Sequence, residues 1–278
     1  MLSINIGPLA LPVGLVSLLI AGIAAAGIGH WVGRRTQTGI VNSLSDMLIA
    51  AVVAARIGFV VAWFEVYRAT PWSMLDIRDR GFLLWPGVVA ALLVALWQGW
   101  RRPALRKPLA AGLVAGALVW GGFFIATRPS AQTPLPTTAL TTLAGEPTNL
   151  AQLAGGKPLV VNLWASWCPP CRREMPVLAA AQQRETGVSF VFVNQGEDAA
   201  SAQRYLQTGR LELANVLLDP GTALGHEVGS RALPTTLFYD ATGRRVDTHL
   251  GELSAASLAS KLRLLRAPDR SPELPHDR

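Results

Sequence analysis

Four long apolar runs occupy the first half of this sequence. They cover residues 8–31, 47–64, 82–100 and 108–126. A helix needs about 20 apolar residues to cross the hydrocarbon core of a bilayer, and each run is that long or nearly so. Buried core helices are the alternative, but short basic loops between the runs favour membrane spans. We therefore expect an all-α, four-span transmembrane region within residues 1–127.

The excess positive charge of the chain lies entirely in this apolar half. The net charge is +7, and residues 1–128 hold 11 Lys and Arg against 4 Asp and Glu, whereas residues 129–278 hold 14 of each sign. A nucleic-acid-binding surface would carry its basic residues on a soluble face. Nucleic acid is therefore not an expected partner.

The basic residues also predict an orientation. Arg34 and Arg35 follow the first run, and four more basic residues separate the third run from the fourth. Because positive loops stay in the cytoplasm, both termini are expected on the other side. The first run has no Lys or Arg before it and is too long for a cleaved signal peptide. We expect a multi-pass protein of the bacterial cytoplasmic (inner) membrane whose second half faces the periplasm.

Arg56 lies inside the second apolar run, where a charge is costly. An ion pair with Asp46 or Glu65 is one interpretation. Binding of a lipid phosphate is the other.

Three motifs in this half resemble prolipoprotein diacylglyceryl transferase over roughly residues 4–102. They are IGPLAL at 6–11, ARIGFV at 55–60 and the stretch 79–89. Pro12 stands where that family has a histidine, and residues 85–87 read Trp-Pro-Gly where it has His-Gly-Gly. The resemblance implies a degenerate membrane anchor without transferase activity.

A segment rich in Pro and Thr, residues 128–141, separates the two halves and is expected to be an extended linker. Residues 142–267 then alternate apolar strands with helices, which predicts an α/β domain. The expected strands are 158–164, 188–194, 215–218, 235–239 and 244–250, and the expected helices are 169–184, 199–207, 222–228 and 254–265. Residues 268–278 are expected to be a disordered tail.

The only two cysteines of the chain, Cys168 and Cys171, lie where a strand runs into a helix. Cys168 is expected at the helix N-cap, with Pro169 and Pro170 in the first turn. The helix dipole and the Cys171 amide favour the thiolate of Cys168. We therefore expect Cys168 to be the exposed nucleophile and Cys171 the buried resolving thiol, with exchange through a mixed disulfide.

A zinc site is the alternative for this pair, but it needs two more ligands, and the remaining histidines of this half, His226, His249 and His276, are scattered. We expect no metal and no other cofactor.

Pro234, which precedes an apolar strand, suits a cis peptide bond beside the disulfide, and its backbone could pair with an extended client. A plain turn proline is the alternative there.

Residues 164–171 (WASWCPPC), the RREMP that follows, and ALPTTLFYD at 232–240 resemble the TlpA/ResA branch of the thioredoxin superfamily over about residues 138–266. The resemblance implies a thioredoxin-like fold and a membrane-tethered extracytoplasmic thiol:disulfide oxidoreductase, mostly reducing and often serving cytochrome c maturation. It implies four catalytic residues, which are Cys168, Cys171, Glu174 and Pro234. It also implies five residues that flank the active site, which are Trp164, Trp167, Pro169, Pro170 and Leu233.

One position departs from thioredoxin. Thioredoxins carry a buried Asp where this chain has Asn162, so Glu174 is expected to take the Cys171 proton. A solvated helix Glu is the alternative for that residue.

Three functions remain open. The first is reduction of client disulfides, with apocytochrome c among the possible clients. Because the membrane half has no cysteine, a separate DsbD- or CcdA-like donor would then re-reduce the pair. The second is a disulfide-forming oxidase, recharged by a DsbB-like protein. The third is a lipid- or prolipoprotein-binding module with accessory redox activity.

Overall fold

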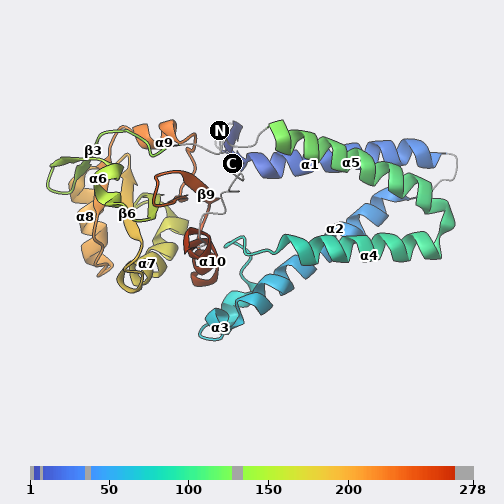
Figure 1. Cartoon of the computed structure of the whole chain (residues 1–278), viewed down its shortest axis with the longest axis horizontal. Coiled ribbons are helices and arrows are strands. Elements are labelled where there is room, and N and C mark those ends of the chain that lie inside the picture. The colour runs from blue at the N-terminus through green and yellow to red at the C-terminus, as the bar shows by residue number, and fades with distance from the viewer. Residues whose placement is uncertain (1–2, 7–8, 35–38, 127–133, 267–278) are drawn as a thin grey trace, which may run out of the picture. The chain divides into compact units, whose positions relative to one another are not determined.

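The computed structural model describes residues 3–6, 9–34, 39–126 and 134–266 (Figure 1). The chain divides into two compact units near residue 130. Residues 128–133 of the expected linker and the whole expected tail, residues 268–278, lie outside the described residues.

The N-terminal unit begins with a short hairpin and continues as apolar helices. The strands β1 (Ser3–Ile6) and β2 (Leu9–Pro12) pair in antiparallel fashion. The helix α1 (Val13–Gly33) therefore begins after Pro12 and not at residue 8 as expected, since proline is tolerated only in the first turn of a helix. The structure thus shortens the first expected span at its N-terminal end.

The long helices of this unit pack in two pairs. Helix α1 lies along α5 (Arg106–Ala126), and α2 (Ile40–Ala62) lies along α4 (Leu84–Arg101) (Figure 1). Glycines permit the close approach, because a Cβ on Gly112 would lie 2.7 Å from the carbonyl oxygen of Ala25. The short helices of the unit are α3 (Phe64–Tyr67), η2 (Pro71–Leu75) and η3 (Pro103–Leu105).

Among the described residues, three helices are long and apolar enough to cross a membrane. They are Val13–Gly33, Ile40–Ala62 and the helix Pro103–Ala126, with 21, 23 and 24 residues. The run that predicted the remaining span, 82–100, forms the 18-residue helix α4, which ends with the polar Gln98 and Arg101. The structure therefore gives three candidate spans where the sequence predicted four.

The partner expected for Arg56 was wrong. The guanidinium pairs with Asp79 at 2.9 Å, and not with Asp46 or Glu65. It also donates to the carbonyl oxygens of Ser73, Met74, Asp76 and Gly81. The hydroxyl of Tyr67 donates to the second oxygen of Asp79 at 2.8 Å. The segment after α3 folds back onto α2, so the chain itself satisfies the charge that the alternative interpretation assigned to a lipid phosphate.

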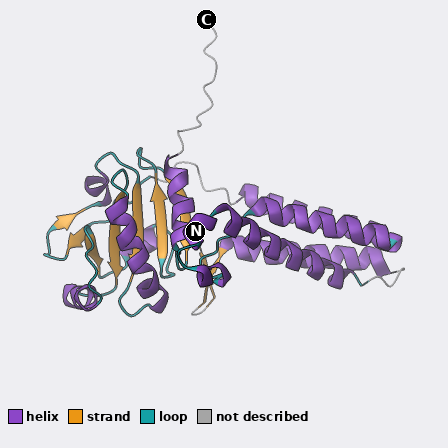
Figure 2. Cartoon of the chain, turned by 90° about the horizontal axis from the view of Figure 1, so that it is seen from below, coloured by secondary structure: helices purple, strands orange, loops and turns teal. Residues whose placement is uncertain are grey.

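The second unit contains one seven-stranded sheet in the order β4-β3-β7-β6-β5-β8-β9. Its strands are β3 (Leu140–Thr142), β4 (Pro147–Thr148), β5 (Leu159–Trp164), β6 (Ser189–Gln195), β7 (Val216–Asp219), β8 (Thr235–Tyr239) and β9 (Arg245–Leu250). The three central strands β5, β6 and β7 run parallel, and β8 and β9 join the β5 edge in antiparallel fashion. Figure 2 shows these strands side by side with helices lying across them.

The helices of this unit are α6 (Leu150–Ala154), α7 (Pro169–Arg184), α8 (Ala199–Thr208), α9 (Ala223–Glu227) and α10 (Ala255–Arg266). Met175 and Leu178 of α7 pack with Leu258 of α10 and with Val160 and Phe190 of the sheet in one buried cluster. The alternation of β5 and β6 between two buried faces explains why both strands read as continuous apolar runs. The expected α/β thioredoxin-like unit is confirmed.

The last residues of the expected linker, 128–141, belong to this unit. The amides of Thr137 and Thr138 donate to the carboxylate of Glu227 at 3.0 and 3.2 Å. Strand β3 then begins at Leu140 and pairs with β7.

Candidate redox-active site

The two cysteines lie at the junction of β5 and α7, as the sequence predicts. Cys168 is the N-cap of α7, and Pro169 begins the helix, where its missing N–H leaves no hydrogen bond unmade. The two sulfurs form a disulfide, with the Cα atoms 5.3 Å apart. The amide of Cys171 also points to the sulfur of Cys168 at 3.3 Å. The first turn of α7 thus directs its amide and its dipole to the Cys168 sulfur.

Burial of the pair differs from the expectation in one respect. Cys171 is fully buried as predicted, but Cys168 is only 3% exposed and not the open nucleophile that the sequence suggested. Both cysteines belong to the buried cluster of the unit, and Leu233 packs against that cluster. In contrast, Trp167 is 67% exposed, whereas Trp164 is buried against Tyr205 with ring centroids 5.3 Å apart.

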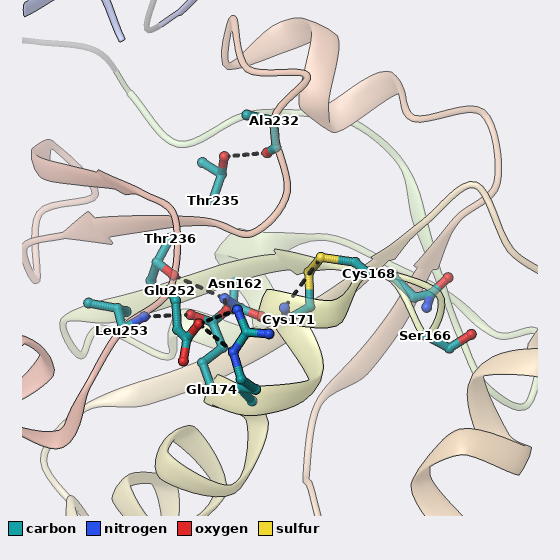
Figure 3. The surroundings of a disulfide bond; sticks show 12 residues. Asn162, Ser166, Cys168, Cys171, Glu174, Ala232, Thr235, Thr236, Glu252 and Leu253 are labelled. Carbon is teal, nitrogen blue, oxygen red and sulfur yellow. Dashed lines mark hydrogen bonds and ion pairs between the residues drawn. A yellow bond between two sulfur atoms is a disulfide. The ribbon is translucent and has the colours of Figure 1, made fainter. Parts of the chain in front are cut away.

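Glu174 follows Cys171 by one helical turn and is fully buried, so the alternative of a solvated helix Glu is wrong. Its Oε1 accepts from Nδ2 of Asn162 at 2.8 Å, and its Oε2 accepts from the amide of Leu253 at 2.9 Å (Figure 3). The same Asn162 amide group donates to the hydroxyl of Thr236 at 3.0 Å. The β5 residue that replaces the thioredoxin Asp therefore holds the carboxyl group of α7.

Burial raises the pKa of Glu174 to about 8. The hydrogen bonds from Leu253 and Asn162 oppose that rise, and the charge of Glu252 adds to it. Glu252 itself is held by Arg173, with 2.7 Å between Nη2 and the carboxylate. The carboxyl of Glu174 is therefore largely neutral at pH 7 in the disulfide-bonded state, and it can change its charge close to neutral pH.

The peptide bond between Leu233 and Pro234 is cis, which confirms that expectation. The carbonyl of Pro234 accepts from the amide of Gly251 at 2.9 Å, and the carbonyl of Ala232 accepts from the hydroxyl of Thr235 at 2.6 Å. Within the described part of the chain, the backbone of Leu233 makes no hydrogen bond. The Pro234 carbonyl is therefore already engaged within the fold, whereas the Leu233 backbone is not.

Sequence reasoning missed a second carboxylate beside the site. Glu197 accepts from the amide of Ser166 and from Nδ2 of Asn194, each at 2.7 Å, and it also bonds the Ser166 hydroxyl. It therefore fixes the loop that leads from β5 to Cys168. Nothing in the sequence pattern marked this residue, because the contact joins the ends of β5 and β6. Among the described residues, no group of three or more His, Cys, Asp or Glu is placed to hold a metal.

A thioredoxin-like sheet that carries a disulfide-bonded C-x-x-C pair at a helix N-terminus defines a thiol:disulfide oxidoreductase. Comparison with known proteins agrees. The family model described as Redoxin matches residues 130–262. The chain is 31% identical to the thiol-disulfide oxidoreductase ResA of Halalkalibacterium halodurans over 126 residues, which cover 45% of this chain and 70% of the relative.

Two further relatives are thiol:disulfide interchange proteins. The chain is 33% identical to DsbE of Pseudomonas fluorescens over 52% of its own length and 82% of the relative. It is 32% identical to HelX of Rhodobacter capsulatus over 58% of its own length and 94% of the relative. The chain therefore belongs to the ResA/DsbE family of thiol:disulfide oxidoreductases, and its redox-active pair is Cys168 and Cys171.

Proposed function

We propose that this protein reduces disulfides of client proteins on the periplasmic side of the cytoplasmic membrane. The thiolate of Cys168 attacks a client disulfide, which forms a mixed disulfide and releases one client thiolate. The sulfur of Cys171 then attacks Cys168 and releases the second client thiolate. Two electrons pass to the client, and the Cys168–Cys171 disulfide remains on the enzyme.

The observation that carries the proposed thiol–disulfide exchange, in either direction, is the buried carboxyl of Glu174 one turn from Cys171. Cys171 must lose a proton when it attacks, and no solvent reaches it, since it is fully buried. Glu174 accepts that proton and becomes the neutral carboxyl that a pKa of about 8 favours in the disulfide-bonded state. When the disulfide is reduced again, Glu174 returns the proton to Cys171.

The flanking residues supply the client surface. Trp167 presents an exposed ring next to Cys168, and the unpaired backbone of Leu233 offers an N–H and a C=O to an extended client segment. Pro169 and Pro170 stand in the first turn of α7, and Trp164 belongs to the same buried cluster as the two cysteines. Leu233 packs against the buried cluster that contains both cysteines.

The reducing direction is part of the proposal and rests on the resemblance to the TlpA/ResA branch. Such an enzyme needs a separate electron donor, because its own membrane half contains no cysteine. We propose a DsbD- or CcdA-like dithiol protein as donor and apocytochrome c as one client. Trapping tests this directly: a Cys171→Ala variant should accumulate mixed disulfides with cysteine-pair clients, and a trap free of any cytochrome precursor would remove that client from the proposal.

A disulfide-forming oxidase is the second candidate, and one contact favours it. The Cys171 amide at 3.3 Å from the Cys168 sulfur stabilises a thiolate, and a stable thiolate makes the pair more oxidising. The reduction potential separates the two candidates.

The membrane half is proposed to anchor this unit through four spans, with α4 as the additional one beside the three candidate helices. The packing of α4 along α2 supports this, as does the basic loop that follows α4. The family match begins at residue 130, so the transferase resemblance of residues 4–102 stays a prediction, as does a role in presenting prolipoproteins. Cysteine substitutions in the loops, tested with a membrane-impermeant thiol reagent on intact cells, would decide span number and side.

A further inference from the structure

The N-terminal unit contains a polar cavity at one end of the α2–α4 pair. Its volume is about 440 Å³, a size common for ligand sites. The residues that line it come from the first turns of α2 and from the last turns of α4 with the residue after it. They are Asn42, Ser43, Asp46, Trp97, Gln98, Arg101 and Arg102. Polar and charged residues are scarce in these apolar helices, so their convergence at one end indicates a binding site for a polar ligand.

Both signs of charge line this cavity without neutralising each other. Asp46 accepts from Nε2 of Gln98 at 2.9 Å. Among the described residues, Asp46 forms no ion pair with Arg101 or Arg102. Arg101 instead lies over the ring of Trp97, with its guanidinium carbon 5.6 Å from the ring centroid. A ligand that carries a cation and an anion a few atoms apart would satisfy both groups.

A buried amide oxygen points to the same kind of ligand. Gln98 is 8% exposed, and its Oε1 has no hydrogen-bond partner within the described chain. A buried acceptor without a donor costs free energy, so a ligand N–H group placed between Gln98 and Asp46 would stabilise the cavity. A primary ammonium would donate to both Asp46 and Gln98.

The location of the cavity indicates that such a ligand comes from the membrane. The cavity lies at the end of a candidate membrane helix, among the basic loop residues. On α4 the apolar Leu93 and Leu96, one to two turns from Arg101, are 60% and 70% exposed and leave an apolar surface for acyl chains. Trp97 and Trp100 beside them are aromatic residues of the type that sits at the headgroup level.

We propose that this cavity binds the headgroup of an aminophospholipid, a phosphodiester that bears a primary ammonium. Arg101 and Arg102 hold the phosphate, and Asp46 with Gln98 receives the ammonium. The acyl chains lie along the exposed face of α4. This site is independent of the redox reaction, so neither proposal depends on the other.

Lipid competition tests the proposal on the full chain. The purified protein is stripped of lipid and reconstituted with an equimolar mixture of phosphatidylethanolamine, phosphatidylcholine and phosphatidylglycerol of matched acyl chains. Retained lipid is then counted by native mass spectrometry. We expect phosphatidylethanolamine to exceed phosphatidylcholine by about tenfold, since the trimethylammonium group cannot donate the two hydrogen bonds. Equal retention of the three lipids, or a preference for phosphatidylglycerol, would overturn the proposal.

Variants assign the effect to the cavity. Asp46→Asn should remove the preference for the ammonium lipid, whereas Arg101→Gln should lower retention of every phospholipid. Lys107→Gln is the matched control, because Lys107 is an exposed cation in the first turn of α5, close in sequence to Arg101 and outside the cavity. An unchanged preference in Asp46→Asn contradicts the proposal.

Two further arms remove ambiguity. The comparison of ethanolamine with choline lipids uses the unaltered chain, so it decides the matter even where a variant does not fold. Soluble glycerophosphoethanolamine should compete only at far higher concentration than the lipid. Equal potency would mean that the ligand is a free phosphodiester and would overturn the lipid assignment.

Discussion

Glu174 should make the stability of the oxidised redox unit depend on pH. Its pKa is about 8 in the fold against an ordinary value of 4.5, because burial disfavours the charged form. Between those two pH values the folded state keeps a proton that the unfolded state has released. The free energy of unfolding therefore falls as pH rises from 4.5 to about 8, and this contribution is flat outside that window.

The magnitude follows from the shift. Each unit of pKa corresponds to about 1.4 kcal/mol, so a rise from 4.5 to about 8 amounts to about 5 kcal/mol between the ends of the window. No discount for solvent screening applies, since the residue is fully buried. This is a large share of the stability of a small domain.

The assay is urea unfolding of oxidised residues 131–278 at a series of pH values. Trp164 and Trp167 are the only tryptophans in that segment, so fluorescence reports on the site. Glu174→Gln should flatten the slope between pH 4.5 and 8 while lowering stability at pH 4.5, because an amide cannot accept from both Asn162 and Leu253. Glu212→Gln, at an exposed glutamate of the same unit, is the control and should keep the wild-type slope. Equal slopes in the Glu174→Gln variant and the wild type would refute the reasoning.

Three further predictions concern single contacts. Cys171→Ala should trap clients through Cys168, seen as bands sensitive to reductant on gels, and Cys168→Ala should trap none. Glu197→Gln should weaken the loop before Cys168 and lower stability by about 1–3 kcal/mol, measured by thermal unfolding; a change within error would show that the loop holds itself. Arg56→Gln removes the ion pair that Arg56 makes with the buried Asp79 and should cost about 3–5 kcal/mol in the full chain in detergent, whereas Arg68→Gln, in an exposed pair, should cost at most about 1 kcal/mol; equal costs would contradict the buried-pair account.

The sequence predicted most of the redox unit because its elements carry local signals. The helix expected at 169–184 is α7 itself, Pro169–Arg184, since a cysteine N-cap followed by prolines marks its start. Strand β8, Thr235–Tyr239, also matches its expected bounds. The short elements β3, β4 and α6 were missed, because they are too short for a periodic pattern and lack the apolar run that marks the similarly short β7.

The contacts that define the site were harder to predict because they join distant parts of the chain. The sequence marked Glu174 as a candidate but left its burial open, since burial depends on α10 and on the loop at Leu253. Similarly, Arg56 lies in an apolar run with Asp46 and Glu65 as the nearby acids. Its partner Asp79 follows a turn that no hydrophobic pattern in the sequence predicts. Contacts between residues so far apart in the sequence depend on the conformation of the loops, which the sequence pattern does not predict.

The reduction potential of the Cys168–Cys171 pair tests the central claim most directly. The full chain contains no other cysteine, so alkylation followed by mass spectrometry counts oxidised and reduced protein without interference. Equilibration with a dithiol buffer at pH 7 gives the potential. A reductase predicts a value near that of thioredoxin, about −270 mV, and a value near about −120 mV, that of a strong oxidant, would contradict the account.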